Sequence, residues 1–292
     1  MIRPLHLVVF LLIAMIWGFN FAVAKIGLAQ LPPIMMMALR WGLVGMLLAP
    51  FVKPPHGCWR QVFLVSFTLG FVHFALMFTG LKNLDAATAA IAIQLQVPFA
   101  ALLAAVFFND KLGWRRALGM AIAFIGVAIV AGEPRLAGVT VPLALVIVAA
   151  CVWSVANVQI KKMGDVDGMM LNAWVGVFAA PQLALASLLL EEGQGAALAA
   201  ADWRAAMAVV YQAVVVVIVG YGAWFWMLRR YAVNQVMPFT LLVPGFGVLS
   251  GVLVLGETLT LPLVVGGLLT IIGVGVITII RPKLVAAEAD RV

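Results

Sequence analysis

The stretch Asp110-Lys111-Leu112, followed by Gly119 and Gly126, recurs 147 residues later as Glu257-Thr258-Leu259 with Gly266 and Gly273. In both places the stretch separates two long apolar runs. An earlier part of the chain recurs as well, at a shorter offset of 136, because Trp17 and Lys25 match Trp153 and Lys161. The chain is therefore predicted to contain two repeats whose loops differ in length.

The composition predicts that both repeats lie in a membrane. A hydrophobic content of 65%, a charged content of 10% and a mean hydropathy of +1.17 exclude a soluble domain of 292 residues. A bilayer core of about 30 Å needs roughly 20 apolar residues per helix. The expected spans are residues 5–27, 33–52, 60–81, 86–108, 114–131, 139–161, 168–190, 205–228, 234–256 and 260–280.

Each half contains five of these spans, and an odd number forces the halves to cross the bilayer in opposite directions. We expect an all-α integral membrane protein with ten transmembrane helices as two inverted five-helix repeats. The repeats should cover residues 1–132 and 139–281, with a cytoplasmic tail at 282–292. Inverted repeats are typical of secondary transporters, whose substrate site lies near the bilayer midplane between the repeats.

The basic residues predict the orientation, because Lys and Arg are retained on the cytoplasmic side. With the N-terminus inside, 13 of the 18 basic residues fall on the inner side, so both termini are expected to be cytoplasmic. A cleavable signal peptide is the competing interpretation of the first span, since Ala22-Val23-Ala24 resembles a cleavage site. Cleavage would remove the repeat partner of the sixth span. The net charge of +7 follows this topology, and no nucleic-acid partner is expected.

No carboxylate is expected at the membrane centre, because all eleven acidic residues fall in loops, at span ends or in the tail. Proton-driven transporters commonly carry an intramembrane Asp or Glu. Either His73 takes that role, or transport runs down the gradient of the substrate. His73 shares a narrow face of the third span with Met77 and small residues. It is either a neutral ring bonded to a neighbouring helix or a titrating group in a cavity.

Arg40 is expected about 10 Å into the second span, because it lies seven residues after Pro33. An arginine at this depth must pair or snorkel. Two roles remain open for it: a structural contact with helix-end carbonyls or lipid headgroups, and attraction of a substrate carboxylate. Lys25, close to the outer end of the first span, has the same two interpretations.

Each repeat places a tryptophan and an asparagine on one helix face. Trp17 and Asn20 are three residues apart, and Trp153 and Asn157 are four apart. An aromatic wall beside an amide suits a small zwitterion or an aromatic ring. The alternative is that the asparagines bond across helices and the tryptophans fill volume. The presence of both pairs in both repeats favours a cavity.

The fourth, eighth and ninth spans contribute further polar or helix-breaking residues. Gln94 and Gln96 point to different sides of their helix, so one should line the cavity and the other bind a neighbouring helix. Pro98 and Pro244 occupy matching positions of the two halves and are candidate hinges, or sources of simple helix curvature. The predicted cavity residues are Trp17, Asn20, His73, Met77, Gln94, Gln96, Trp153, Asn157, Gln212 and Tyr221.

Motifs for chemical catalysis are missing from the sequence. It has no phosphate-binding loop of the Gly-Lys-Ser/Thr type, so ATP-driven pumping by this chain is not expected. His6, His56 and His73 are isolated, and no nucleophile stands beside a partner base. We expect no catalytic residue, no metal site and no cofactor, and we expect Cys58 and Cys151 to be free thiols.

The residues resemble the drug/metabolite transporter superfamily and, within it, the EamA-type exporters. The matching segments are Trp17-Gly18-Phe19-Asn20-Phe21 with Lys25, Pro32-Pro33 with Arg40-Trp41, Gly80-Leu81, Gln94 to Pro98, Asp110-Lys111-Leu112, Gly220-Tyr221-Gly222, and Pro244 through Leu259. They extend over nearly the whole chain. Asp110 departs from the expected glutamate but is also an acid. The resemblance implies a central cavity formed mainly by the first, third, fourth, sixth, eighth and ninth helices.

The resemblance also implies a function. Similar proteins export amino acids and their derivatives, including cysteine, O-acetylserine, threonine, homoserine and aromatic amino acids. We therefore expect a non-enzymatic exporter of amino acids in a bacterial inner membrane, working by alternating access as a monomer or homodimer. The alternatives are export of other metabolites or cationic drugs, which the missing carboxylate disfavours, and a passive channel.

Overall fold

The computed structural model describes residues 3–108, 113–133, 136, 138–231 and 233–279. Asp110, Lys111 and Leu112 of the repeated stretch lie outside the described residues, as does the predicted tail at 282–292. All regular elements in the described part are helices, and ten helical segments there are long and apolar enough to cross a membrane. Their ends agree with the sequence expectation to within three residues. The fold class is therefore confirmed as an all-α membrane protein.

The first half contains spans one to five. They are α1 (Pro4–Leu28); α2 (Pro33–Leu48) with η1 (Ala49–Phe51); α3 (Trp59–Val65), η2 (Ser66–His73) and α4 (Phe74–Asn83); α5 (Ala86–Ala92), η3 (Ile93–Leu95) and α6 (Gln96–Phe108); and α7 (Trp114–Ala131). Pro33 is the first residue of α2, where a missing backbone N–H costs nothing because it would be unpaired in any case.

The second half contains spans six to ten. They are α8 (Thr140–Lys162); α9 (Gly168–Leu190), followed by the short α10 (Gln194–Ala200); α11 (Trp203–Val210), η5 (Tyr211–Tyr221) and α12 (Gly222–Leu228); α13 (Val233–Val236), η6 (Met237–Leu241) and α14 (Leu242–Leu255); and α15 (Leu261–Ile279).

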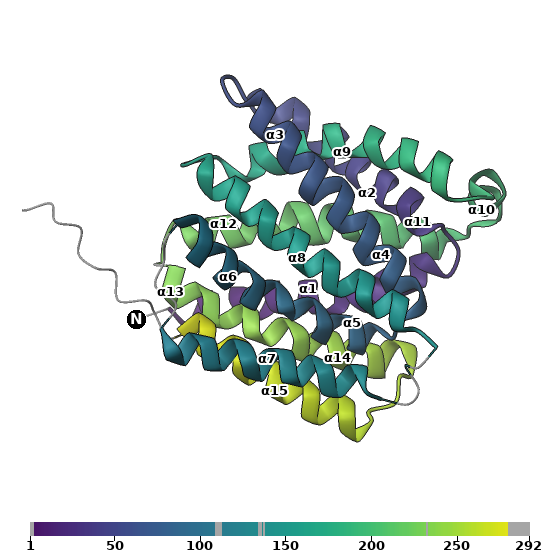
Figure 1. Cartoon of the computed structure of the whole chain (residues 1–292). Helices are drawn as coiled ribbons and strands as arrows, with labels where there is room; N and C mark the ends of the chain where they lie inside the picture. Colours follow the sequence, from purple (N-terminus) through teal and green to yellow (C-terminus); the bar gives the residue numbers. More distant parts are fainter. Residues whose placement is uncertain (1–2, 109–112, 134–135, 137, 232, 280–292) are drawn as a thin grey trace, which may run out of the picture.

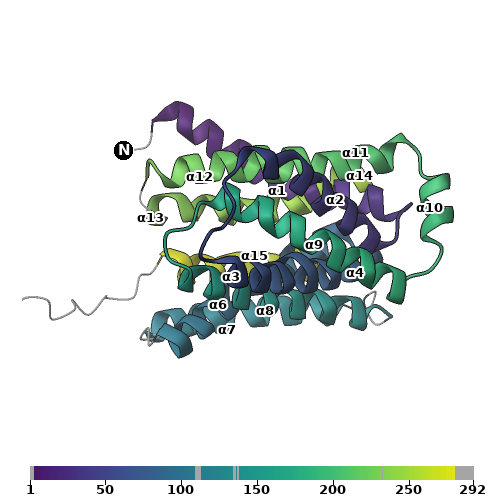
Figure 2. The same cartoon turned by 90° about the horizontal axis from the view of Figure 1, so that it is seen from above.

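The two halves are packed through matching pairs of spans. Span five contacts span ten (α7 with α15), and span two contacts span seven (α2 with α9). Span one packs on span nine through α14, and in the same way span six packs on span four through α6. Figure 1 shows the α7–α15 pair at one edge of the bundle and the α2–α9 pair at the other. Figure 2 shows α10 at the end of the bundle opposite the N-terminus.

The contact between α7 and α15 depends on glycine. A Cβ atom on Gly126 would lie 2.5 Å from the Gly266 carbonyl oxygen, and one on Gly273 would lie 2.5 Å from the Gly119 carbonyl oxygen. Small residues let helix backbones approach closely in a membrane, where dispersion replaces the hydrophobic effect as the source of association. The small residues noted in the sequence thus join the two halves to each other.

Equivalent spans share the same departures from α-helical geometry. Spans three and eight contain the π-helical segments η2 and η5, whereas spans four and nine contain the 3₁₀ segments η3 and η6. In η5 the run 214–218 is β-branched throughout, which crowds an α-helix. Pro98 and Pro244 are each the third residue of the α-helix that follows the 3₁₀ segment. Each proline therefore lies where a helix restarts, in a first turn that tolerates it.

The glycine crossing yields a stability test. Gly126→Ala should destabilise the protein by about 1–3 kcal/mol, because the added methyl group must push α15 away. Gly245→Ala on α14 is the matched control, since a Cβ there meets no atom within 4 Å. Thermal unfolding in detergent measures the stability of both variants. Equal midpoints for the two variants would contradict the importance of this crossing.

Candidate functional site

Arg40 is the most unusual polar residue in the interior. It is only 2% exposed, and its guanidinium carbon lies 4.6 Å from the ring centre of Phe74 and 5.6 Å from that of Trp41. Its Nη1 donates a 3.2 Å hydrogen bond to Oε1 of Gln212 on η5, so the contact crosses between the halves. None of the ten spans contains an Asp or Glu, and among the described residues no carboxylate pairs with Arg40.

The hydrogen bonding around Arg40 is incomplete. Its Nε and the Nε2 of fully buried Gln212 are both buried without a hydrogen-bond partner. Buried donors without partners are uncommon, because each costs about 1–3 kcal/mol. A fixed positive charge beside two free N–H donors is complementary to a carboxylate.

Two aromatic contacts flank this position and are related by the inverted repeat. The Trp17 ring lies 5.0 Å from the ring of Tyr221, and the Trp153 ring lies 5.0 Å from that of His73. Tyr221 ends η5 and His73 ends η2, so each tryptophan packs on the final π-helical residue of the other half. Gly220 permits the first contact, because a Cβ there would lie 2.8 Å from Nε1 of Trp17.

Trp17 and the nearby Asn20 of α1 also present unpaired polar atoms. Nε1 of Trp17 and Oδ1 of Asn20 are buried and have no hydrogen-bond partner within the described part of the chain. The indole N–H is a donor and the amide oxygen an acceptor. One donor and one acceptor are thus left unpaired at these two residues, and their role in a substrate cavity stays a prediction.

His73 is bonded to the neighbouring helix α8. Its Nδ1 lies 2.9 Å from the carbonyl oxygen of Ala149, and because a carbonyl only accepts, Nδ1 carries a proton. The ring also packs edge-on against Phe74 at 4.7 Å. The Phe74 ring thus contacts both His73 and Arg40.

The other predicted cavity residues have different surroundings. Met77 lies in the hydrophobic core, since the face it shares with Gly70 packs against neighbouring helices and Gly70 meets Ala179 of α9. Gln94 is buried in η3, Gln96 is half-buried, and Asn157 is exposed on α8. None of these three side chains makes a hydrogen bond in the part of the chain that the structure describes. Their placement in the cavity stays a prediction.

Sequence reasoning missed the pair Gln182–Ser66. Nε2 of Gln182 on α9 donates a 3.2 Å hydrogen bond to Oγ of Ser66 on η2. Gln182 lies 142 residues after Arg40, a distance between the two repeat offsets of 136 and 147. The Arg40–Gln212 bond joins span two to span eight, and the Gln182–Ser66 bond joins span seven to span three. The pair is therefore the uncharged counterpart of Arg40–Gln212. The repeat offset was the signal that could have found it.

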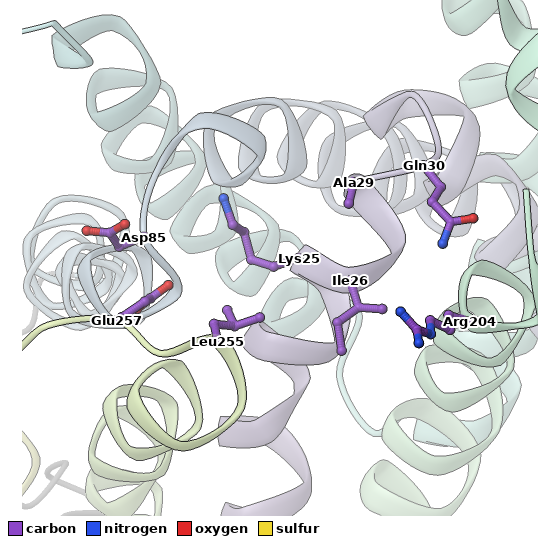
Figure 3. Close-up of a pocket in the computed structure, with 8 residues that line it drawn as sticks. All are labelled: Lys25, Ile26, Ala29, Gln30, Asp85, Arg204, Leu255 and Glu257. Carbon is purple, nitrogen blue, oxygen red and sulfur yellow. The ribbon is translucent and has the colours of Figure 1, made fainter.

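A second polar region is a pocket of about 450 Å³ at the α10 end of the bundle (Figure 3). Figure 3 shows Asp85 and Glu257 together on one side of Lys25, with Gln30 and Arg204 on the far side. Gln30 donates a 2.8 Å hydrogen bond to Asp202 and lowers the pKa of that carboxyl from its ordinary value. Asp202 therefore stays ionised where it caps the start of α11.

Lys25 and Glu257 fix the helix ends beside this pocket. Nζ of Lys25 donates to the carbonyl oxygens of Leu81 and Lys82 at the end of α4, at 3.3 and 3.0 Å. The Glu257 carboxylate accepts from the backbone N–H groups of Ala86 and Ala87 at the start of α5, at 2.6 and 2.9 Å. A second-half side chain thus caps a first-half helix. Lys25 has a structural role here, the first of its two interpretations.

The comparisons with known proteins agree with this architecture. The profile of the family described as "EamA-like transporter family" matches twice, at residues 5–132 and 140–279. The chain belongs to the EamA-like transporter family. Membership makes it a membrane transporter and not an enzyme, as expected from the sequence. Within the described residues, no group of three or more His, Cys, Asp or Glu could hold a metal ion.

Two relatives of this EamA-like transporter carry the name "Probable amino-acid metabolite efflux pump". The protein of Salmonella typhimurium is 33% identical over 273 residues, covering 90% of this chain and 91% of the relative. That of Escherichia coli is 32% identical over 260 residues, covering 86% and 87%. A solved crystal structure with 19% identity covers 94% of this chain and 96% of its own, with a TM-score of 0.65, and shares the fold.

Capping by Glu257 can be tested directly. Glu257→Ala should lower the free energy of unfolding by about 0.5–2 kcal/mol, the range for loss of a helix N-cap. Glu257→Gln should lose less, because its amide keeps one acceptor oxygen. Asp165→Ala, at an exposed loop position, is the control. Denaturation of the purified proteins measures the free energy of unfolding of each variant. A Glu257→Ala protein as stable as the control would contradict the capping role of Glu257.

Proposed function

We propose that this EamA-like transporter exports amino acids and related carboxylate-bearing metabolites from the cytoplasm. The single observation that carries the proposal is Arg40, a buried cation with free donors around it and no carboxylate partner among the described residues. An intramembrane arginine is costly unless it has a function or a partner. A substrate carboxylate supplies the missing acceptor oxygens.

The remaining polar and aromatic groups fit the ammonium end of a zwitterion. Oδ1 of Asn20 is a free acceptor, and the faces of Trp17 and Tyr221 attract cations. This reading supports zwitterionic amino acids over cationic drugs, because a cation alone would oppose the charge of Arg40. The two relatives named as amino-acid metabolite efflux pumps support the same class. Cysteine, O-acetylserine, threonine, homoserine and aromatic amino acids are the first substrates to test.

Transport is proposed to proceed by alternating access between the halves. The basic residues favour cytoplasmic termini, so we propose that α10 and the pocket of Figure 3, at the end of the bundle opposite the N-terminus, lie on the outer side. The restarted helices at Pro98 and Pro244 supply matching points where spans four and nine can bend. The residues around Arg40 then face either side in turn.

Liposomes containing the purified protein test the substrate class. Wild type should take up labelled amino acid saturably and in competition with unlabelled amino acid. Arg40→Gln should weaken substrate affinity about 10- to 100-fold, because a charged hydrogen bond is worth about 1.5–3 kcal/mol. Arg40→Lys should restore part of it.

Arg204→Gln is the matched control, since Arg204 is exposed in the pocket of Figure 3. It should leave transport unchanged at equal protein level in the membrane. Unsaturable flux would show a channel, and an undiminished Arg40→Gln protein would refute the carboxylate site. Transport of a decarboxylated amine by wild type, at the rate of the amino acid, would also count against it.

The drive for transport is proposed to be the gradient of the substrate itself. No span contains an Asp or Glu, and the proton on Nδ1 of His73 is held by the Ala149 carbonyl. An imposed pH gradient should therefore not concentrate amino acid in the liposomes, and His73→Ala should respond to the gradient as wild type does. Several-fold accumulation in wild type that is lost in His73→Ala would show proton coupling through this ring.

A further inference from the structure

A groove on the side of the bundle lies apart from the Arg40 group. It has a volume of about 580 Å³ and is bounded by the start of α2, by η2 and α4, by α8, and by the end of α9. Figure 1 shows α4 running between α9 and α8, and both helices contact this span. The groove thus opens where spans six and seven separate at the α10 end.

The floor of the groove is one face of span three. Phe71, Val72, Ala75, Leu76 and Thr79 line it and are half-buried. The residues that lie between these in sequence, including His73, Phe74 and Met77, point to the opposite face of the helix and are buried against the rest of the protein. An apolar face left half-covered within a span faces lipid hydrocarbon.

The length of the groove matches one leaflet of a bilayer. Phe71 to Lys82 is a stretch of twelve residues of mostly α-helix, or about 16 Å from end to end. This is half of the roughly 30 Å hydrocarbon core. Lys82 lies in the last turn of α4, one residue before the end of the third span.

The rim of the groove carries charges of both signs. The side chains of Lys82 and Glu192 are exposed, and neither makes a hydrogen bond or ion pair in the described part of the chain. The neighbouring Glu191 is occupied, because it caps the N–H groups of Ile34 and Met35 at 2.8 and 3.0 Å. One free ammonium group and one free carboxylate are therefore left for a headgroup.

We infer that this groove binds a phosphatidylethanolamine molecule of the leaflet on the α10 side. One acyl chain lies along the floor formed by span three. The phosphate pairs with Lys82, and the primary ammonium group pairs with Glu192. A phosphatidylglycerol headgroup offers Glu192 only neutral hydroxyl donors, and phosphatidylcholine has no N–H to donate.

Lipid retained through purification tests this inference. Membranes containing equal amounts of phosphatidylethanolamine, phosphatidylglycerol and phosphatidylcholine are solubilised, and the lipids that remain with the purified protein are quantified by mass spectrometry. Wild type should retain phosphatidylethanolamine in about two- to fivefold excess over either of the others, the range expected from one exposed ion pair. The double variant Lys82→Gln/Glu192→Gln should lose that excess.

Two further variants separate headgroup recognition from the apolar groove. Ala75→Leu adds side-chain volume to the floor and should reduce retention of all three lipids, whereas Ala121→Leu on the exposed face of α7 should not. The double variant Lys53→Gln/Asp165→Asn removes exposed charges away from the groove and should keep the excess. Equal retention of all three lipids by wild type, or an excess that survives Lys82→Gln/Glu192→Gln, would overturn the inference.

Discussion

The hydrocarbon core of a bilayer supplies no hydrogen-bond partner, so the protein itself must satisfy every helix end that lies near it. The corner between α4 and α5 shows how this chain meets the constraint. Glu257 binds two N–H groups of α5, and Lys25 binds two carbonyl groups of α4. Gly256 makes this possible, because its φ of 71° ends α14 and turns the chain toward α5. The Glu257 side chain thereby joins the two halves by hydrogen bonds to backbone N–H groups, in addition to the glycine packing.

The fold was largely predictable because its signals are local. Apolar length alone located the spans, and the recurrence of Gly119 and Gly126 as Gly266 and Gly273 indicated the repeat. The partners of polar residues were not predictable in this way. Glu257 reads as an acid at a span end, but its partners lie 171 and 170 residues away, and Gln212 lies 172 residues from Arg40. Only the folded chain shows that Lys25 caps a helix while Arg40 keeps free donors.

The cavity stays a prediction, because helical spacing shows which residues share a face but not what that face meets. The tryptophan–asparagine faces follow from helical spacing, and Trp17 and Trp153 both occupy equivalent inter-half contacts. Met77 shares a face with His73, but helical spacing cannot tell whether that face meets a cavity or another helix. Here Ala179 and Val175 of α9 fill the space beside Gly70, and the face is part of the core. The repeat also hides an asymmetry, since Gln182 stands where the other half has Arg40.

The π-helical segments give the two aromatic contacts an unusual geometry. Bonding from residue i to i+5 winds more residues into each turn than α-helical bonding does. If a segment converted to α-helix, its span would lengthen and everything beyond it would rotate about the helix axis. His73 and Tyr221 stand at the boundary between the two forms. A shift of the π-to-α boundary by one residue would therefore turn the aromatic ring at that boundary relative to its tryptophan.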